Sequence, residues 1–158
     1  MLIKFVVPGQ PFGKLNMQPV RIAGHSSLVQ PKKNVSYMDH VINSINEKFK
    51  TNNEQYEIDK PIFSKDEPLY VSIHAYFKLQ SVHYGKKGIN QSGLDKLEGK
   101  ILPTMKPDCD NISKIICDAV TQSGIVWFDD SQVVTLLVMK EYAEIPRVEV
   151  SIENRKIN

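Results

Sequence analysis

Acidic side chains are concentrated in one short part of the sequence. Between positions 107 and 130 a single lysine, Lys114, accompanies five aspartates: Asp108, Asp110, Asp118, Asp129 and Asp130. Mg²⁺ that acts on phosphate groups is held by one or a few carboxylates, with waters and phosphate oxygens completing its shell. A carboxylate at a helix start, another in the first turn and a third from the end of a neighbouring strand would close such a site. The acidic stretch is therefore a candidate site for metal-assisted chemistry on a phosphate group.

Lys114 stands four residues after Asp110, which places the two side chains on one face of a helix. There its charge would neutralise negative charge developing on a phosphate or help to position the attacking water. The structural alternative is an ordinary ion pair between the two residues. Asp108 is likewise a good helix N-cap, and Asp129 and Asp130 are common turn residues. These structural explanations do not account for two groups of acids within reach of one helix.

Positive charge precedes the acidic stretch in two segments. Residues 1–38 contain no acid but carry Lys4, Lys14, Arg21, Lys32 and Lys33. The second segment holds Lys86, Lys87, Lys96, Lys100 and Lys106 against only Asp95 and Glu98. Lysines that neutralise phosphates, near carboxylates that hold a cation, are what a metal-dependent nuclease requires. The alternative is that these lysines are solvated side chains on loops, because the net charge of the chain is only +2.

Length and composition indicate one globular domain over residues 1–158. The chain is 41% hydrophobic and 24% charged, which excludes disorder over most of its length. Its apolar runs fall short of the ~20 residues that span a bilayer, so we expect no membrane partner. Pro8 and Pro11 interrupt the apolar start, so we expect no secretion signal and place the protein in the cytoplasm.

The two cysteines support the same location. Cys109 and Cys117 are eight residues apart in a predicted helix, about 12 Å along its axis. A disulfide needs Cα atoms within ~7 Å of each other, so these two thiols cannot pair. We interpret both as structural thiols in a reducing compartment.

Apolar periodicity predicts the elements that carry the charged residues. We expect strands at 2–7, 69–79, 125–127, 133–142 and 148–152, and helices at 36–50, 93–100 and 108–124. Ser36 is the expected N-cap of the first helix. Residues 12–33 are expected to form a long irregular connection, the main part of a basic N-terminal loop at about 9–33. The order predicts a single α+β domain whose helices pack on one face of a sheet.

The helix that carries most of the acids is the most clearly marked element. Asp108 can cap its N-terminus, and Gly124 stands where a C-terminal glycine belongs. Between them runs an apolar stripe formed by Ile112, Ile115, Ile116, Ala119 and Val120. Asp110 and Lys114 lie opposite that stripe, so we expect them to face away from the core.

Several of these residues together resemble the signature of the RusA family of Holliday-junction resolvases. The resemblance is carried by residues 106–111 (KPDCDN), Lys114, Asp118 with Ala119, and residues 124–134 (GIVWFDDSQVV). The separation between the two blocks also matches. Weaker family features are residues 8–11 (PGQP) followed by Lys14, and the strand pair at 133–152. Cys109 stands where leucine is usual, and we expect it to pack rather than react.

The resemblance implies a RusA-like fold with a mixed β-sheet and a homodimeric, Mg²⁺-dependent endonuclease, with Mn²⁺ as a possible substitute. Such enzymes nick four-way DNA junctions symmetrically in recombination and repair, and phages or prophages typically encode them. On this chain the resemblance places the metal-binding aspartates at Asp108, Asp110 and Asp130 and the catalytic lysine at Lys114. We expect DNA contacts from Lys14, Arg21, Lys32, Lys33 and Lys106.

Two other functions stay open on the sequence. One is a less selective nuclease that acts on flaps, forks or RNA duplexes through the same metal site. The other is a non-catalytic nucleic-acid-binding protein whose acidic cluster is structural. The histidines His25, His40, His74 and His83 have no metal-ligand spacing and are expected to be structural or solvated. Trp127 is expected to be a core residue rather than a base-stacking one.

Overall fold

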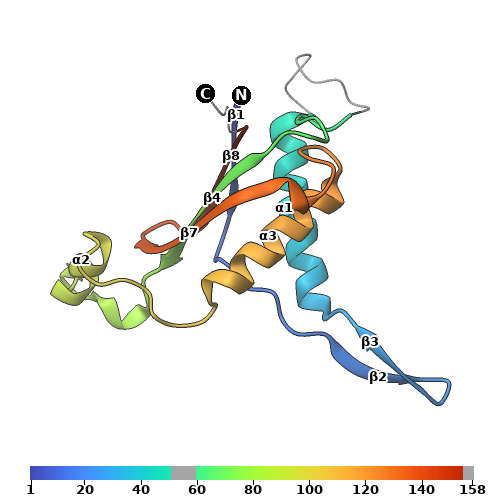
Figure 1. The fold of residues 1–158 in the computed structure, drawn as a ribbon. Helices are drawn as coiled ribbons and strands as arrows, with labels where there is room; N and C mark the ends of the chain where they lie inside the picture. The colour runs from blue at the N-terminus through green and yellow to red at the C-terminus, as the bar shows by residue number, and fades with distance from the viewer. Residues whose placement is uncertain (51–59, 155–158) are drawn as a thin grey trace.

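A four-stranded mixed sheet forms the centre of the molecule (Figure 1). The computed structural model describes residues 1–50 and 60–154. The strand order is β1 (Leu2–Pro8), β8 (Arg147–Asn154), β4 (Leu69–Lys78) and β7 (Val133–Ala143). β8 runs antiparallel to both of its neighbours, whereas β7 runs parallel to β4. These strands confirm four of the five predicted from the sequence, and they confirm the mixed sheet.

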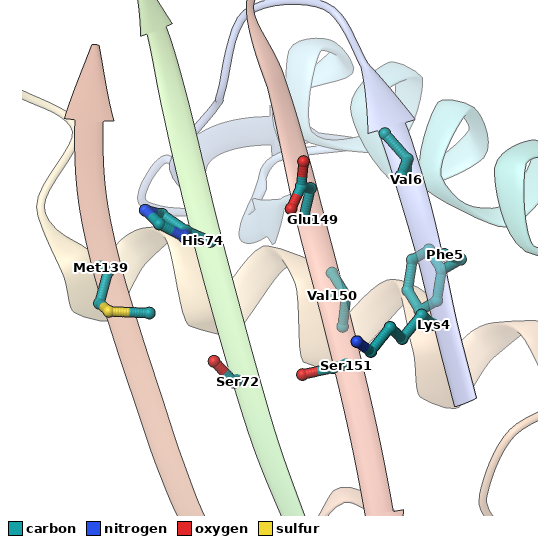
Figure 2. Close-up of a pocket in the computed structure, with 9 residues that line it drawn as sticks. All are labelled: Lys4, Phe5, Val6, Ser72, His74, Met139, Glu149, Val150 and Ser151. Atoms are coloured by element: carbon teal, nitrogen blue, oxygen red, sulfur yellow. The ribbon is translucent and has the colours of Figure 1, made fainter. Parts of the chain in front are cut away.

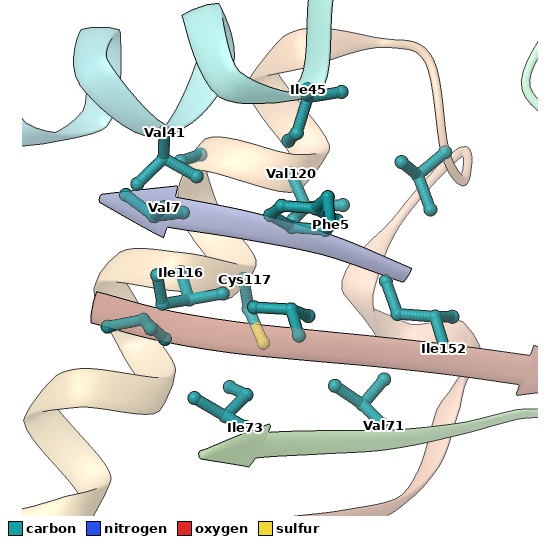
Figure 3. Close-up of a cluster of buried hydrophobic side chains, with 14 of the residues drawn as sticks. Phe5, Val7, Val41, Ile45, Val71, Ile73, Ile116, Cys117, Val120 and Ile152 are labelled. Atoms are coloured by element: carbon teal, nitrogen blue, oxygen red, sulfur yellow. The ribbon is translucent and has the colours of Figure 1, made fainter. Parts of the chain in front are cut away.

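Two helices cover one face of this sheet, as predicted (Figure 3). They are α1 (Lys32–Phe49) and α3 (Cys109–Ser123), which also pack against each other. Val41 and Ile45 of α1 meet Val120 of α3 above the apolar side chains of the sheet. The sheet presents an apolar face to these helices because every second side chain of β4, from Leu69 to Phe77, is buried on that side.

The opposite face of the sheet carries polar side chains together with apolar ones such as Val6 and Met139 (Figure 2). Lys4, Ser72, Glu149 and Ser151 line a shallow pocket of about 200 Å³ on it. His74 stands beside them, with its Nε2 atom 3.2 Å from a carboxylate oxygen of Glu141. This environment agrees with a structural role for His74.

The predicted basic N-terminal loop at 9–33 is wrong in its middle part. β2 (Gln18–Ile22) and β3 (His25–Val29) form an antiparallel hairpin that projects from the body of the protein (Figure 1). The turn between them has positive φ angles at Ala23 (49°) and Gly24 (83°), as the type I′ turn of a two-residue hairpin requires. All five residues of β3 are exposed, so no alternation of buried and exposed positions marks the strand in the sequence.

The first helix begins earlier than predicted. α1 starts at Lys32, and its N-cap residue is Pro31 rather than Ser36. Pro31 has an extended backbone (φ −56°, ψ 139°) and provides no side-chain hydrogen bond to the helix. The helix opens with the polar residues Lys32, Lys33 and Asn34, so apolar periodicity does not mark its start.

The segment between β4 and α3 holds short elements only. They are the 3₁₀ turn η1 (Ser81–His83), β5 (Tyr84–Gly85), β6 (Gly88–Ile89) and α2 (Gln91–Leu97). α2 confirms the short helix predicted at 93–100, although it lies slightly earlier. Asn90 caps it by accepting a hydrogen bond from the backbone N–H of Gly93 at 3.0 Å.

The strand predicted at 125–127 is absent. The carbonyls of Ile125 and Val126 accept hydrogen bonds from the backbone N–H groups of Ile62 (2.8 Å) and Phe63 (3.0 Å), so the segment pairs with a distant part of the chain outside the sheet. Trp127 is 1% exposed, and its indole N–H donates to the Thr121 hydroxyl at 2.8 Å. Trp127 is therefore a core residue, as predicted.

In residues 1–50 and 60–154, no helix has both the length and the apolar character needed to cross a membrane.

Candidate active site

Helix α3 positions the first group of acids. It ends at Gly124, whose left-handed backbone (φ 65°) confirms the predicted C-terminal glycine. Asp108 occupies the N-cap position, but its side chain makes no capping hydrogen bond. The carboxylate of Asp108 instead forms an ion pair with the ammonium group of Lys106. Asp108 is thus the predicted N-cap residue, but its carboxylate makes a charged contact outside the helix in place of a capping hydrogen bond.

Asp110 and Lys114 form the ion pair that their spacing allows. The Nζ atom of Lys114 lies 3.1 Å from Oδ2 of Asp110, and this contact lowers the pKa of Asp110. The side chain of Asp110 is 62% exposed and that of Lys114 is 58% exposed. Exposed ion pairs contribute little to stability because water already solvates both charges. A contribution to helix stability therefore does not by itself explain why Asp110 and Lys114 are paired.

The second acidic pair divides into two different environments. Hydrogen bonds from the Ser131 side chain and from its backbone N–H, the latter at 2.9 Å, lower the pKa of the Asp129 carboxyl. The backbone contact caps the 3₁₀ turn η2 (Asp130–Gln132). Asp130 instead lines a pocket of about 250 Å³ together with Lys114 and Asp118 of α3. Asp129 thus shapes the turn, while Asp130 shares a pocket with Asp118 and Lys114 of α3.

Buried Gln132 holds this turn in place. Its amide nitrogen donates to the backbone carbonyls of Ser64 (2.8 Å) and Glu67 (3.3 Å). Its amide oxygen accepts from the backbone N–H of Phe128 at 2.9 Å. Gln132 stands in the motif that carries the family resemblance, yet the sequence assigned it no role. The sequence feature that could have indicated this role is a long polar side chain directly before a strand. Such a side chain is stable in a buried position only when it is hydrogen-bonded.

We expect Gln132→Leu to lower the melting temperature. The substitution removes the hydrogen bonds that the buried Gln132 amide makes with the Ser64 and Glu67 carbonyls and with the Phe128 N–H. Each such hydrogen bond contributes about 0.5–1.5 kcal/mol. A combined cost of about 3 kcal/mol lowers the melting temperature of a domain of this size by roughly 6–12 °C. Thermal denaturation measures it, with Gln91→Leu as control because the Gln91 hydrogen bond to Asp95 is exposed. Equal melting temperatures for the two variants would contradict the role given to Gln132.

An ion pair between Lys14 and Asp118 joins the N-terminal segment to this site. The backbone N–H of Lys14 also donates to the carbonyl of Asn111 at 2.8 Å. Gly13 permits the approach, since a Cβ atom there would lie 2.4 Å from Cβ of Pro107. Lys14 has no acidic neighbour in the sequence and was expected to be unpaired. This expectation is wrong, because Asp118 pairs with Lys14 in the folded chain. The sequence also assigned no role to Asp118, which lies on the wall of the Asp130 pocket.

Cys117 lines the same pocket as Asp130, but it does not act there as a charged group. Burial raises the pKa of the Cys117 thiol to about 12, and the carboxylates of Asp130 and Asp118 contribute in the same direction. The thiol therefore stays protonated at neutral pH and is a poor metal ligand. Cys109 is exposed, so the expectation that it packs is wrong. Both cysteines are free, as predicted.

The predicted metal ligands have suitable chemistry, but they do not form a closed cluster. Carboxylate oxygens are the donors that Mg²⁺ prefers. In the part of the chain that the structure describes, no group of three or more His, Cys, Asp or Glu side chains could hold a metal ion as placed. Asp108 and Asp110 each contact a lysine instead. The ligand set Asp108, Asp110 and Asp130 stays a prediction.

The residues predicted to contact DNA lie in three places. Arg21 is exposed on the β2–β3 hairpin, and Lys32 and Lys33 are exposed in the first turn of α1, close to the base of that hairpin in the chain. Lys106 is 80% exposed directly before α3. Lys14 is only 32% exposed because of its contact with Asp118.

Comparison with known proteins connects this arrangement to a family. A family model described as endodeoxyribonuclease RusA matches residues 8–153 of the chain. A stretch of 55 residues is 51% identical to the uncharacterized protein YqaN of Bacillus subtilis strain 168. The stretch covers 35% of this chain and 37% of that protein. The chain thus spans well under two thirds of the length of this relative.

Proposed function

The chain belongs to the RusA family of endodeoxyribonucleases, and on that premise we propose that it is a Mg²⁺-dependent endonuclease that resolves four-way DNA junctions. One observation carries the proposal beyond the family match. Asp130, from the turn before β7, lines the same pocket as Lys114 and Asp118 of α3. Two separate elements thus bring two carboxylates and a lysine to one open surface site, and groups of this kind serve metal-assisted phosphodiester hydrolysis.

We propose that Asp108, Asp110 and Asp130 hold Mg²⁺, with Mn²⁺ as a substitute. The bound ion would supply an activated water and neutralise charge on the phosphate. Lys114 would place its ammonium group where negative charge develops on the phosphate oxygens. Asp129 and Gln132 would keep the turn that carries Asp130 in position, through their hydrogen bonds to Ser131 and Phe128.

We also propose that the protein acts as a homodimer on branched DNA in the cytoplasm, during recombination and repair. A prophage is the typical source of such a protein. Two copies related by a two-fold axis fit the symmetry of a four-way junction, because each copy would then cut one of two equivalent strands. This explains paired symmetric nicking without a second kind of active site.

A substrate panel tests the selectivity. The protein is incubated with Mg²⁺ and with a labelled four-way junction, a fork, a flap and a linear duplex of matched sequence. We expect nicks in the junction and at least tenfold slower cleavage of the other substrates. Equal cleavage of all branched substrates would support the less selective nuclease instead. Tight binding with no cleavage of any substrate would support the non-catalytic binding protein.

The exposed lysines at the start of α1 give a second test. Two positive charges in the first helical turn oppose the helix dipole, so helix stability does not explain their position. If Lys32 and Lys33 contact DNA phosphates, replacing both with alanine lowers by two the number of phosphate contacts that release counterions on binding. We expect the slope of log affinity against log salt to flatten by about 1.8 units.

The matched control for this salt titration is the double variant Lys48→Ala/Lys50→Ala at the other end of the same helix, which should keep the slope of the wild type. Turnover on saturated junction should stay near the wild-type value in both variants. An unchanged slope for Lys32→Ala/Lys33→Ala would place these lysines away from the DNA.

A further inference from the structure

A second pocket, of about 340 Å³, lies next to the acidic site. Residues 11–15 of the N-terminal segment form one of its sides, and Lys106, Pro107 and Asn111 form the other. Pro107 directly precedes Asp108 and Asn111 directly follows Asp110, so the two predicted metal ligands flank this second side. Neither the motif nor the proposed mechanism gives this pocket a purpose.

The walls of the pocket are apolar although the pocket is open to solvent. Leu15 is 42% exposed, and the half-buried ring of Phe12 lies at the pocket with its centroid 5.2 Å from that of Tyr37. The close contact of Gly13 with Pro107 fixes the two sides against each other. An apolar hollow with an aromatic wall suits a flat, weakly polar ring system.

The rim of the pocket carries positive charge that is tied to the acidic site. Lys106 contacts Asp108, and Lys14 contacts Asp118. Both lysines also line the apolar pocket, so the pocket and the acidic site share these two side chains. A DNA strand whose phosphate lies at the acids would therefore place an adjacent nucleotide beside two ammonium groups and an apolar hollow.

We propose that this pocket receives one unstacked nucleobase of the cleaved strand, next to the phosphate that is cut. The inference rests on the proposed action on branched DNA, where bases at the branch point are easier to unstack than bases inside a duplex. Phe12 and Leu15 contact the faces of the base, and the lysines contact its flanking phosphates. The side-chain amide of Asn111 provides a donor and an acceptor for the edge of the base. The pocket thus makes the position of the cut depend on one neighbouring nucleotide.

An abasic-site scan tests this proposal through binding alone. Junctions that lack a single base at successive positions around the branch point are titrated with wild-type protein in EDTA, so that no cleavage occurs. Stacking of one base on a protein surface changes affinity by about 5- to 150-fold. We expect at least a fivefold loss of affinity at one strand position and less than a twofold loss at the others.

Leu15→Trp should fill the pocket and remove that dependence on the base. Because Leu15 is exposed, the larger side chain needs no space in the core. We expect the variant to bind the intact and the abasic junction within twofold of each other. The control Leu2→Trp changes another exposed leucine, on β1, and should retain the wild-type difference. Equal sensitivity to the missing base in wild type and Leu15→Trp, or no sensitive position in the wild type, would overturn the proposal.

The result is separable from the proposed catalytic function. Failure of the wild type to cleave any junction with Mg²⁺ would refute the nuclease proposal but would leave the binding scan unaffected. Normal cleavage with no sensitive position would refute the pocket proposal alone.

Discussion

Asparagine at Asp108, Asp110 or Asp130 is expected to abolish junction cleavage while leaving junction binding intact or tighter. Each substitution keeps the size of the side chain but removes the charge that a metal ligand needs. It also removes a negative charge that repels DNA phosphates. Single-turnover cleavage in Mg²⁺ measures the first effect, and equilibrium binding in EDTA measures the second. A variant that retains wild-type turnover would show that its aspartate is not a ligand.

Asp129→Asn is the matched control for this series. The carboxylate of Asp129 caps η2 through the N–H of Ser131, and the amide oxygen of asparagine can accept the same hydrogen bond. We therefore expect a small effect on turnover. Equal losses for Asp129→Asn and Asp130→Asn would contradict the separate roles that the two positions have in this account.

Lys114→Ala is expected to lower turnover by 10²- to 10³-fold without weakening metal binding. A preorganised group that stabilises charge in the transition state is typically worth about 3 kcal/mol. Binding of Mn²⁺, followed by its electron paramagnetic resonance signal, should not weaken, because the ammonium group repels a cation. Cleavage at saturating Mg²⁺ and junction gives the effect on turnover.

Lys100→Ala provides the comparison for Lys114→Ala. Lys100 is 61% exposed and lies 2.6 Å from a carboxylate oxygen of Glu98, so it is an exposed, paired lysine outside the proposed site. Its replacement should leave turnover within about twofold of the wild type. If Lys114→Ala also cleaved at the wild-type rate, its contact with Asp110 would be an ordinary helix ion pair.

The main elements of the fold were predictable because burial leaves a periodic trace in the sequence. Leu69, Val71 and Ile73 alternate along β4, and Ile112, Ile116 and Val120 follow the turns of α3, because both elements bury one side only. The hairpin β2–β3 was missed since it contacts no core and so carries no such pattern. The order of the strands was not predictable either. β4 lies between β7 and β8, although these two follow each other in the chain.

The candidate site was predictable in its composition but only partly in its geometry. The spacing of Asp110 and Lys114 determines their contact on one helix turn. The contact between Lys14 and Asp118 joins positions 104 residues apart, which no local pattern reveals. The different environments of the adjacent residues Asp129 and Asp130 arise from a turn, which the hydrogen bonds of Asp129 with Ser131 and Gln132 hold in place.

Metal-dependent nicking of one junction tests the central claim most directly. A synthetic four-way junction, labelled on each strand in turn, is incubated with the wild-type protein in Mg²⁺ and, separately, in EDTA, and the products are mapped to the nucleotide. We predict nicks at symmetric positions in two opposing strands with Mg²⁺ and none in EDTA. A junction that is bound but uncut in Mg²⁺, or that is nicked equally in EDTA, would contradict the account.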